Sequence, residues 1–344
     1  MTRLVVANLD AEAEFGGRVL SSRAREAAGV FGALMASFCE EGDALWLPVE
    51  GASELPEIHT RDGECPTVVC GGLANIAARY DELVAWCETP RVSAARTTPG
   101  SVSPDTVAAL HNRRFAHEVA RDVGLVLPGT RWVTSRGDLM AAAREEGSAS
   151  PTHAGWIAKA PMSAAGRERW SGRLDAGGLT AATRLVETHG AALLEPRCER
   201  IDDFGWVGWI DDAGSSTVGV HRLLVDIRGR FGGIEIPDGL PLDLAGQLES
   251  VGLDVGARLH ARGLRGGYGI DAWRWRGPDG RVAFHPLGEI NARMTMAHVA
   301  RQWQRRASVS GVRLSASNTP PSAPSSALLA AVSSPRLSAQ VVAR

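Results

Sequence analysis

With 344 residues, the chain is too long for one ordinary hydrophobic core, which predicts two or three domains. Its 37 basic and 39 acidic residues leave a net charge of −2, which argues against partners bound through bulk positive charge, such as nucleic acid or an anionic membrane surface. No apolar run reaches the length of a membrane span, Asp10 comes too early for a secretory signal, and the five cysteines form no Cys-x-x-Cys pair, so we expect a cytoplasmic protein with reduced thiols.

Residues 1–103 are predicted to form an α/β domain. Buried strands are expected at 4–7, 44–48 and 67–70, and a helix with apolar residues at helical spacing is expected at 22–38. Strands that alternate with helices in this way favour a parallel sheet. The Thr-, Pro-, Gly- and Ser-rich segment 94–103 predicts a linker to the next domain.

Residues 104–310 are predicted to form a second unit that combines helices with antiparallel hairpins. Helices are expected at 105–123, 137–146, 179–188, 244–262 and 298–306, and strands at 126–133, 156–160, 191–196 and within 206–236. A hairpin is expected to run over 268–275, to turn at 277–280 and to return through 281–290. From 311 to 344 the chain is rich in Ser, Ala and Pro without any acidic residue, which predicts a disordered tail.

Lys159 is unusual because every other one of the 37 basic residues is arginine. It lies in an expected strand and is followed by a loop of mostly small residues at 163–169. A lysine retained among arginines indicates a position that needs a compact charge on a flexible stem rather than a planar guanidinium. The alternative is a chance survivor on a solvated surface.

The segment Gly288–Arg293 carries the strongest local signal. Glu289 and Asn291 lie two residues apart in an expected strand and therefore face the same side, and Asp271 lies on the partner strand of the hairpin. Two carboxylates and an amide oxygen form a hard-oxygen set that suits Mg²⁺, and Mn²⁺ is also compatible with it. The alternative is an ordinary solvent-facing strand, although Asn is depleted in strands.

Four features follow one another in a fixed order along the chain. They are Lys159 before its small-residue loop, a strand ending at Glu195-Pro196, the strand Gly269-Ile270-Asp271, and the strand with Glu289-x-Asn291-x-Arg293. This order resembles the ATP-grasp superfamily of carboxylate–amine ligases over roughly residues 105–305. The resemblance implies an α/β and α+β architecture, in which the N-terminal α/β domain precedes a two-lobed ATP-grasp core that binds the nucleotide between its lobes.

The resemblance also implies roles for nucleotide-binding residues. Lys159 would hold the α- and β-phosphates, while the loop with Ser163, Gly166 and Arg167 would close over the β- and γ-phosphates. Glu195 and the backbone after it would meet the adenine, and Asp202 or Asp203 would contact the ribose. Plain structural roles stay open, because Arg167 could be a solvated loop charge and the two aspartates could be turn residues.

The function that the resemblance implies is an ATP- and Mg²⁺-dependent ligase. Asp271, Glu289 and Asn291 would bind the metal, and Arg293 together with Lys159 would act on the transferring phosphoryl group. A small-molecule carboxylate would become an acyl phosphate that an amine then attacks, and no oligomer is indicated. The chain departs from its relatives in having Arg113 or Arg114 where they carry a second lysine. The alternatives are therefore a non-catalytic nucleotide-binding sensor or scaffold and an unrelated α/β binding protein.

Overall fold

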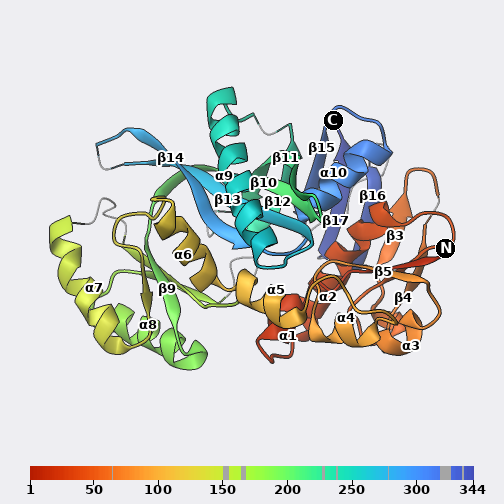
Figure 1. Ribbon diagram of the computed structural model, residues 1–344, viewed down its shortest axis with the longest axis horizontal. Coiled ribbons are helices and arrows are strands. Elements are labelled where there is room, and N and C mark those ends of the chain that lie inside the picture. Colours follow the sequence, from red (N-terminus) through yellow and green to blue (C-terminus); the bar gives the residue numbers. More distant parts are fainter. Residues whose placement is uncertain are drawn as a thin grey trace.

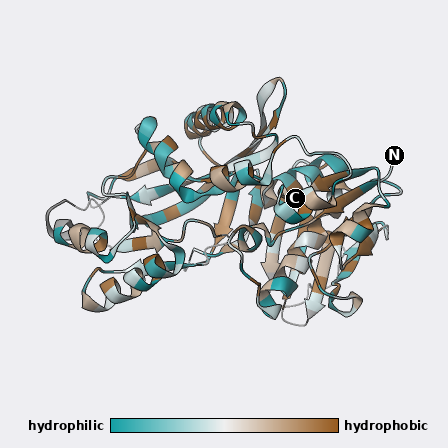
Figure 2. Cartoon of the chain, turned by 60° about the horizontal axis from the view of Figure 1, so that its bottom comes forward, coloured by the Kyte–Doolittle hydropathy of each residue, from teal (hydrophilic) through white to brown (hydrophobic). Residues whose placement is uncertain are grey.

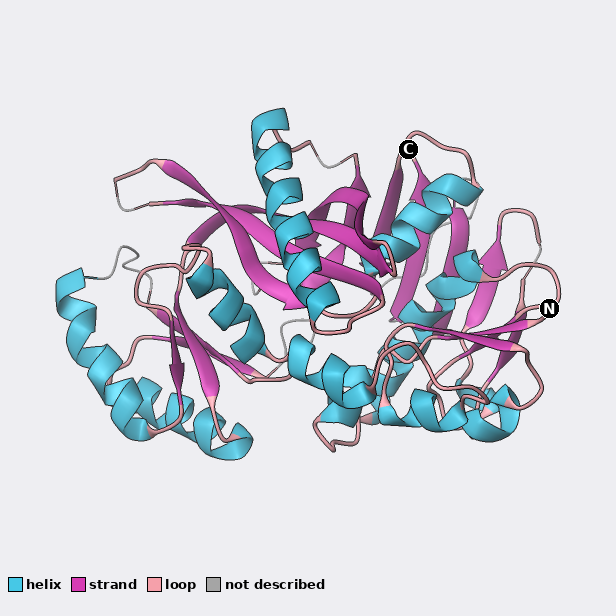
Figure 3. Cartoon of the chain, in the orientation of Figure 1, coloured by secondary structure: helices cyan, strands magenta, loops and turns pink. Residues whose placement is uncertain are grey.

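The computed structural model describes residues 1–344 except 64, 150–154, 164–167, 227–228, 238, 278, 318–326 and 335–336. The described chain is arranged around three sheets, with the N-terminal sheet at the right of Figure 1, a large central sheet, and a small lobe at the left. Figure 3 shows the helices packed around these sheets. Within the described parts of the chain, none of the helices has the length and apolar character that crossing a membrane requires.

The N-terminal sheet is parallel, as predicted, with the strand order β4-β2-β1-β5. Its strands are β1 (Arg3–Val6), β2 (Ala44–Trp46), β4 (Thr67–Val69) and β5 (Glu82–Ala85). The helical segments around it are α1 (Ala11–Phe15), α2 (Ser22–Ala33), the 3₁₀ turns η1 (Leu34–Phe38) and η2 (Ala52–Glu54), α3 (Leu73–Ala77) and α4 (Pro90–Ala95). Helices cover the sheet, and the side chains of Leu4, Val5 and Val6 are accordingly fully buried.

The small lobe has the strand order β6-β9-β7-β8. Its elements are β6 (Arg131–Val133), α7 (Arg136–Ala149), β7 (Trp156–Lys159), β8 (Arg169–Gly172), α8 (Ala176–His189) and β9 (Ala192–Pro196). Two helices, α5 (Pro104–His111) and α6 (Arg113–Asp122), precede it. The sequence predicted one helix here, but Asn112 is extended and its side chain accepts a hydrogen bond from the Arg114 N–H at 2.9 Å, so a new helix begins.

The central sheet has the strand order β14-β13-β10-β11-β12-β15-β17-β16-β3. Its strands are β3 (Glu57–Thr60), β10 (Glu199–Asp211), β11 (Gly214–Val225), β12 (Phe231–Ile236), β13 (Gly266–Arg276), β14 (Val282–Asn291), β15 (Val312–Ser317), β16 (Ala327–Ser334) and β17 (Leu337–Ala343). Helix α9 (Leu242–Ala261) packs on the face of Trp206 and Tyr268. Helix α10 (Met296–Arg306) and the residues before it pack on the opposite face, at Gly267 and Gly269.

The predicted disordered tail after residue 311 is wrong for the described residues, because β15, β16 and β17 are ordered strands. They extend the central sheet from β12 to β3, so the C-terminal segment joins the core to a strand from the first hundred residues. The composition of this segment is poor in charge and rich in small residues, but β16 is a continuous apolar run whose residues Ala327–Ala331 are all buried. Such a run is consistent with a strand that is covered on both faces.

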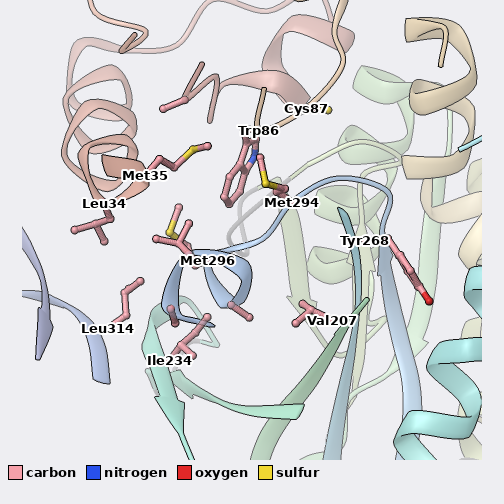
Figure 4. Close-up of a cluster of buried hydrophobic side chains, with 14 of the residues drawn as sticks. Leu34, Met35, Trp86, Cys87, Val207, Ile234, Tyr268, Met294, Met296 and Leu314 are labelled. Carbon is pink, nitrogen blue, oxygen red and sulfur yellow. The ribbon is translucent and has the colours of Figure 1, made fainter. Parts of the chain in front are cut away.

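The main hydrophobic core joins the N-terminal sheet to the central sheet. Figure 4 shows Leu34, Met35 and Trp86 from the N-terminal part beside Met294 and Met296. Figure 2 shows the same distribution across the chain, with hydrophobic segments along the strands and hydrophilic ones on the outer helices and loops. The small lobe has a separate buried cluster around Val133, Trp156 and Leu194. Helix α6, whose apolar residues belong to the main core, also packs on β6 and β9 of the small lobe.

Candidate functional site

The hairpin of β13 and β14 brings the predicted metal residues together. Asp271 pairs with Glu289, and Gly269 pairs with Asn291, so both carboxylates and the amide share one face. This is the face opposite α9, because Gly269 lies against Thr295 at the start of α10. Among the described residues, no three His, Cys, Asp or Glu side chains gather as a metal site, so the candidate set consists of two carboxylates and the Asn291 amide.

The two carboxylates of this set differ in their electrostatic surroundings. Burial, followed by the negative charges of Glu289 and Asp203, raises the pKa of Asp271 to about 7. Burial also acts to raise the pKa of Glu289, but Arg113 and then Lys159 outweigh it and lower that pKa. Arg200 and Lys159 act to lower the pKa of Asp271 but do not offset its burial and the two nearby carboxylates, and a divalent ion would add the missing positive charge.

Lys159 and Glu195 form a nearly buried ion pair in the small lobe. Lys159 ends β7, Glu195 lies on the adjacent β9, and their Nζ and Oε2 atoms are 2.5 Å apart. Only 10% of the Lys159 side chain and 9% of the Glu195 side chain are exposed. The alternative of a lysine on a solvated surface is therefore wrong.

The hinge after β9 offers fewer backbone donors than the sequence predicted for adenine. Pro196 has no N–H group, and the N–H of Arg197 donates to the Gly155 carbonyl at 2.8 Å. The side chain of Glu195 points to Lys159. A base at this hinge would therefore have to use the groups beyond Arg197 or the Glu195 carboxylate itself.

Arg113 connects the small lobe to the central sheet, and no motif predicted this contact. Its Nη1 donates to the Ala160 carbonyl at 2.7 Å and to Ser163 Oγ at 2.8 Å. Its Nη2 donates to the Ser163 carbonyl at 3.1 Å and to Glu289 Oε1 at 2.7 Å. Arg114, by contrast, lies exposed and pairs with Glu118 on its own helix, so Arg113 is the arginine of the two that reaches the candidate site.

The remaining predicted residues fall into three groups. Asp202 and Asp203 are not turn residues, because both lie within β10, where Asp202 pairs with Arg274 and Asp203 accepts from Arg200 Nη1 at 2.6 Å. Gly166 and Arg167 lie outside the described residues. Arg293 lies beyond the end of β14, and its Nε donates to Glu12 Oε1 at 2.6 Å.

Two of the residues at this site, Glu12 and His111, were not predicted. Their contacts span the N-terminal part, the end of α5 and the end of β14, and sequence spacing carries no signal for such long-range contacts. The segment 111–113, read as the interior of one helix, instead supplies both His111 and Arg113 to the site.

A pocket opens beside these groups between α6, β9 and β14. Its walls are largely apolar, with a few convergent charged groups, but its volume of about 20 Å³ is far smaller than that of an open small-molecule site. The lining includes Ala116, Leu193, Leu287, Arg113, Glu195 and Glu289.

No family model matches this sequence, and no curated protein is similar to it. Its structure, however, is similar to several solved structures. N5-carboxyaminoimidazole ribonucleotide synthetase from Thermus thermophilus has a TM-score of 0.61 at 12% identity, over 100% of this chain and 94% of that one. The biotin carboxylase domain of the Hydrogenobacter thermophilus 2-oxoglutarate carboxylase, in complex with MgADP, ADP and bicarbonate, has a TM-score of 0.62 at 12% identity, over 99% and 86%.

A third similar structure is N5-carboxyaminoimidazole synthase from Aspergillus clavatus in complex with ADP and 5-aminoimidazole ribonucleotide. Its TM-score is 0.57 at 10% identity, over 99% of this chain and 94% of that one. These likenesses confirm the predicted architecture. The chain has the ATP-grasp fold, with an N-terminal α/β part before a two-lobed core.

Proposed function

We propose that the protein is an ATP- and Mg²⁺-dependent ligase that activates a small carboxylate as an acyl phosphate and joins it to an amine. The observation that carries this proposal is the convergence of Lys159, Arg113 and Glu289 across the two lobes. Solved structures of the same fold are described as complexes with ADP, with MgADP and bicarbonate, and with ADP and an aminoimidazole ribonucleotide. The substrates of this chain belong, in this proposal, to the same broad classes.

The nucleotide would lie between the two lobes, where Lys159, Arg113 and Glu289 approach one another. The Lys159 ammonium would move partly away from Glu195 and bind phosphate oxygens as a point charge. Arg113 would provide the second cation that a lysine supplies in relatives. Asp203 would face the ribose, and Ser163, Gly166 and Arg167 would close over the terminal phosphates.

Asp271, Glu289 and Asn291 would hold Mg²⁺. They fit the ion because they are hard oxygen ligands on one face of the hairpin, and because Asp271, whose pKa is raised first by burial and then by Glu289 and Asp203, would gain a positive partner. When bound, the ion would neutralise charge between the phosphates.

The chemistry needs two displacements. A substrate carboxylate oxygen attacks the γ-phosphorus, the bond to ADP breaks, and an acyl phosphate forms. The amine then attacks the acyl carbon, and phosphate leaves with the C–O bond electrons while the amine loses a proton. The chain contributes position and positive charge, with Lys159 and Arg293 flanking the transferring group, since phosphoryl transfer asks for little covalent participation by the protein.

Calorimetric titration with MgADP tests the nucleotide and metal part of the proposal. Wild-type protein should bind, and Glu289→Gln should lose most of the Mg²⁺-dependent part of the affinity while remaining folded. Glu118→Gln is the matched control, because Glu118 lies exposed on α6 and pairs with Arg114 of the same helix. Equal binding by wild type and Glu289→Gln would contradict the assignment.

A second candidate is a non-catalytic nucleotide-binding protein that acts as a sensor or scaffold. The contact of Arg113 with Glu289 favours it, because a metal carboxylate held by arginine at 2.7 Å is partly occupied. The two functions differ in turnover. A ligase releases ADP in a reaction that depends on its carboxylate, whereas a sensor binds MgATP and releases no ADP with any carboxylate and amine.

A further inference from the structure

Three charged or polar side chains from distant parts of the chain meet just beyond the end of β14. Glu12 comes from α1 of the N-terminal part, His111 ends α5, and Arg293 follows β14. Glu12 Oε1 lies 3.1 Å from His111 Nε2 and 2.6 Å from both Nε and Nη2 of Arg293. The exposed fractions of the three side chains are 6%, 3% and 10%, so water competes little for these contacts.

The backbone at β14 sets the protonation pattern of His111. The N–H of Ala292 donates to His111 Nδ1 at 3.2 Å, so this nitrogen is an acceptor and carries no proton. A neutral ring then has its proton on Nε2, which donates to Glu12. His111 thus contacts both the backbone N–H of Ala292, next to Arg293, and the Glu12 carboxylate that pairs with Arg293.

The Arg293 guanidinium is fixed on its other sides as well. Its Nη1 donates to the Met294 carbonyl at 2.8 Å, and its carbon lies 5.0 Å from the ring centre of Trp86. The N–H of Met294 in turn donates to the Trp86 carbonyl at 3.1 Å, and Figure 4 shows Trp86 and Met294 side by side. An arginine so enclosed has lost most of its rotamer freedom.

Burying the Glu12–Arg293 ion pair costs desolvation free energy, which suggests that the pair has a role other than stabilising the fold. Burial acts to raise the pKa of Glu12, but Arg293 and His111 outweigh it and lower that pKa, so the carboxylate stays ionised. A buried ion pair often stabilises a fold less than apolar residues of the same shape would. Arg293 also follows the candidate metal residue Asn291 by two positions, and the intervening Ala292 is held by His111, so the network lies directly beside the end of the candidate metal strand.

We propose that Glu12, supported by His111, is a positioning residue that aims Arg293 at the transferring phosphoryl group. This inference rests on the proposed ligase function. The N-terminal α/β part thereby completes the active site of the core, because a residue of α1 orients a group from β14. Glu12 itself touches neither nucleotide nor metal in this proposal and acts only through Arg293.

The variant Glu12→Gln tests this role, because it keeps the size of the side chain and removes its charge. We expect kcat for ADP release to fall about 10- to 100-fold, as for a misplaced catalytic group, with the KM for MgATP changed less than about threefold. Glu12→Asp retains the charge at shorter reach and should recover part of the kcat. Glu14→Gln is the matched control on the same helix, since Glu14 pairs with Arg91 rather than with Arg293.

A readout independent of turnover is the ¹⁵N-detected Nε–H signal of Arg293, assigned by its loss in Arg293→Lys. In wild type this proton should exchange slowly with water, and in Glu12→Gln it should exchange fast while the control retains protection. If Glu12→Gln does not fold, His111→Gln is measured in the same way. Unchanged protection, or unchanged kcat in an active enzyme, would overturn the positioning role. Absent turnover in wild type with protection lost in the variant would instead refute the proposed ligase function alone.

Discussion

Replacing the only lysine with arginine, Lys159→Arg, is the substitution that most sharply probes the site. The Lys159 ammonium lies 2.5 Å from Glu195 Oε2, and only 10% of the lysine side chain is exposed. Arginine keeps the positive charge, so Glu195 retains a partner, but the larger planar group must fit a buried position. We expect overpacking to cost about 1–3 kcal/mol of the free energy of unfolding, which leaves the protein folded.

The functional loss should be larger than the structural loss. A charge-assisted contact is worth about 1.5–3 kcal/mol, so losing the one from Lys159 to phosphate should weaken MgADP binding roughly 10- to 100-fold. Lys159→Ala should bind equally poorly and be less stable than Lys159→Arg, because breaking a buried pair strands Glu195 at a cost of about 3–5 kcal/mol.

Calorimetric titration with MgADP and thermal unfolding measure both effects. The control is Arg114→Lys, the opposite exchange at an exposed position of α6, which should change stability by less than about 0.5 kcal/mol and leave binding intact. Wild-type affinity in Lys159→Arg would refute the reasoning, since it would show that the point charge is not needed.

Three further substitutions follow from burial and charge. Asp271→Asn should abolish the Mg²⁺-dependent gain in melting temperature. It should also stabilise the ligand-free protein at pH 8 by on the order of 1–3 kcal/mol, because the pKa of Asp271 is raised to about 7 and its ionised form therefore destabilises the fold as the pH rises from about 4. In denaturant titrations this stabilisation of the ligand-free variant over wild type should vanish near pH 4. Burial lowers the pKa of His298 to about 4, so its neutral form contributes stability above pH 6.5 that is lost as the pH falls toward 4. The unfolding free energy of His298→Gln should therefore fall less over that range than that of wild type, and an equal fall would contradict a buried neutral ring. Leu329→Ala in β16 should cost about 2–5 kcal/mol in urea unfolding, whereas an unstructured tail would show no effect.

The parts of the fold that the sequence predicted well are those with local periodicity. Alternating residues placed Asp271, Glu289 and Asn291 on one hairpin face, because the side-chain period of a strand is two and needs no knowledge of distant segments. The C-terminal strands were missed because composition was weighed above the short apolar run around Leu329, and because their partner β3 lies far away in the sequence.

The parts of the site that could not be predicted depend on tertiary contacts. The sequence around Asn112 resembles a helix interior. Instead, the Asn112 side chain accepts a hydrogen bond from the Arg114 N–H and caps a new helix, so His111 ends one helix and Arg113 begins the next. Glu12 and Arg293 are 281 residues apart, and neither position carries a local pattern that points to the other. The departure from the relatives' second lysine pointed to Arg113 or Arg114 without choosing between them, and only the structure shows the contacts of Arg113 with Ser163 and Glu289.

The central claim, activation of a carboxylate by phosphoryl transfer, can be tested by following oxygen. Wild-type protein is incubated with MgATP, amines, and ¹⁸O-labelled carboxylates that include bicarbonate, and released ADP and phosphate are analysed by mass spectrometry. An acyl phosphate requires that one carboxylate oxygen leave with the phosphate, so we predict ADP release that depends on the carboxylate and phosphate that carries one ¹⁸O atom. Turnover that gives unlabelled phosphate, or ADP release indifferent to every carboxylate, would contradict the account.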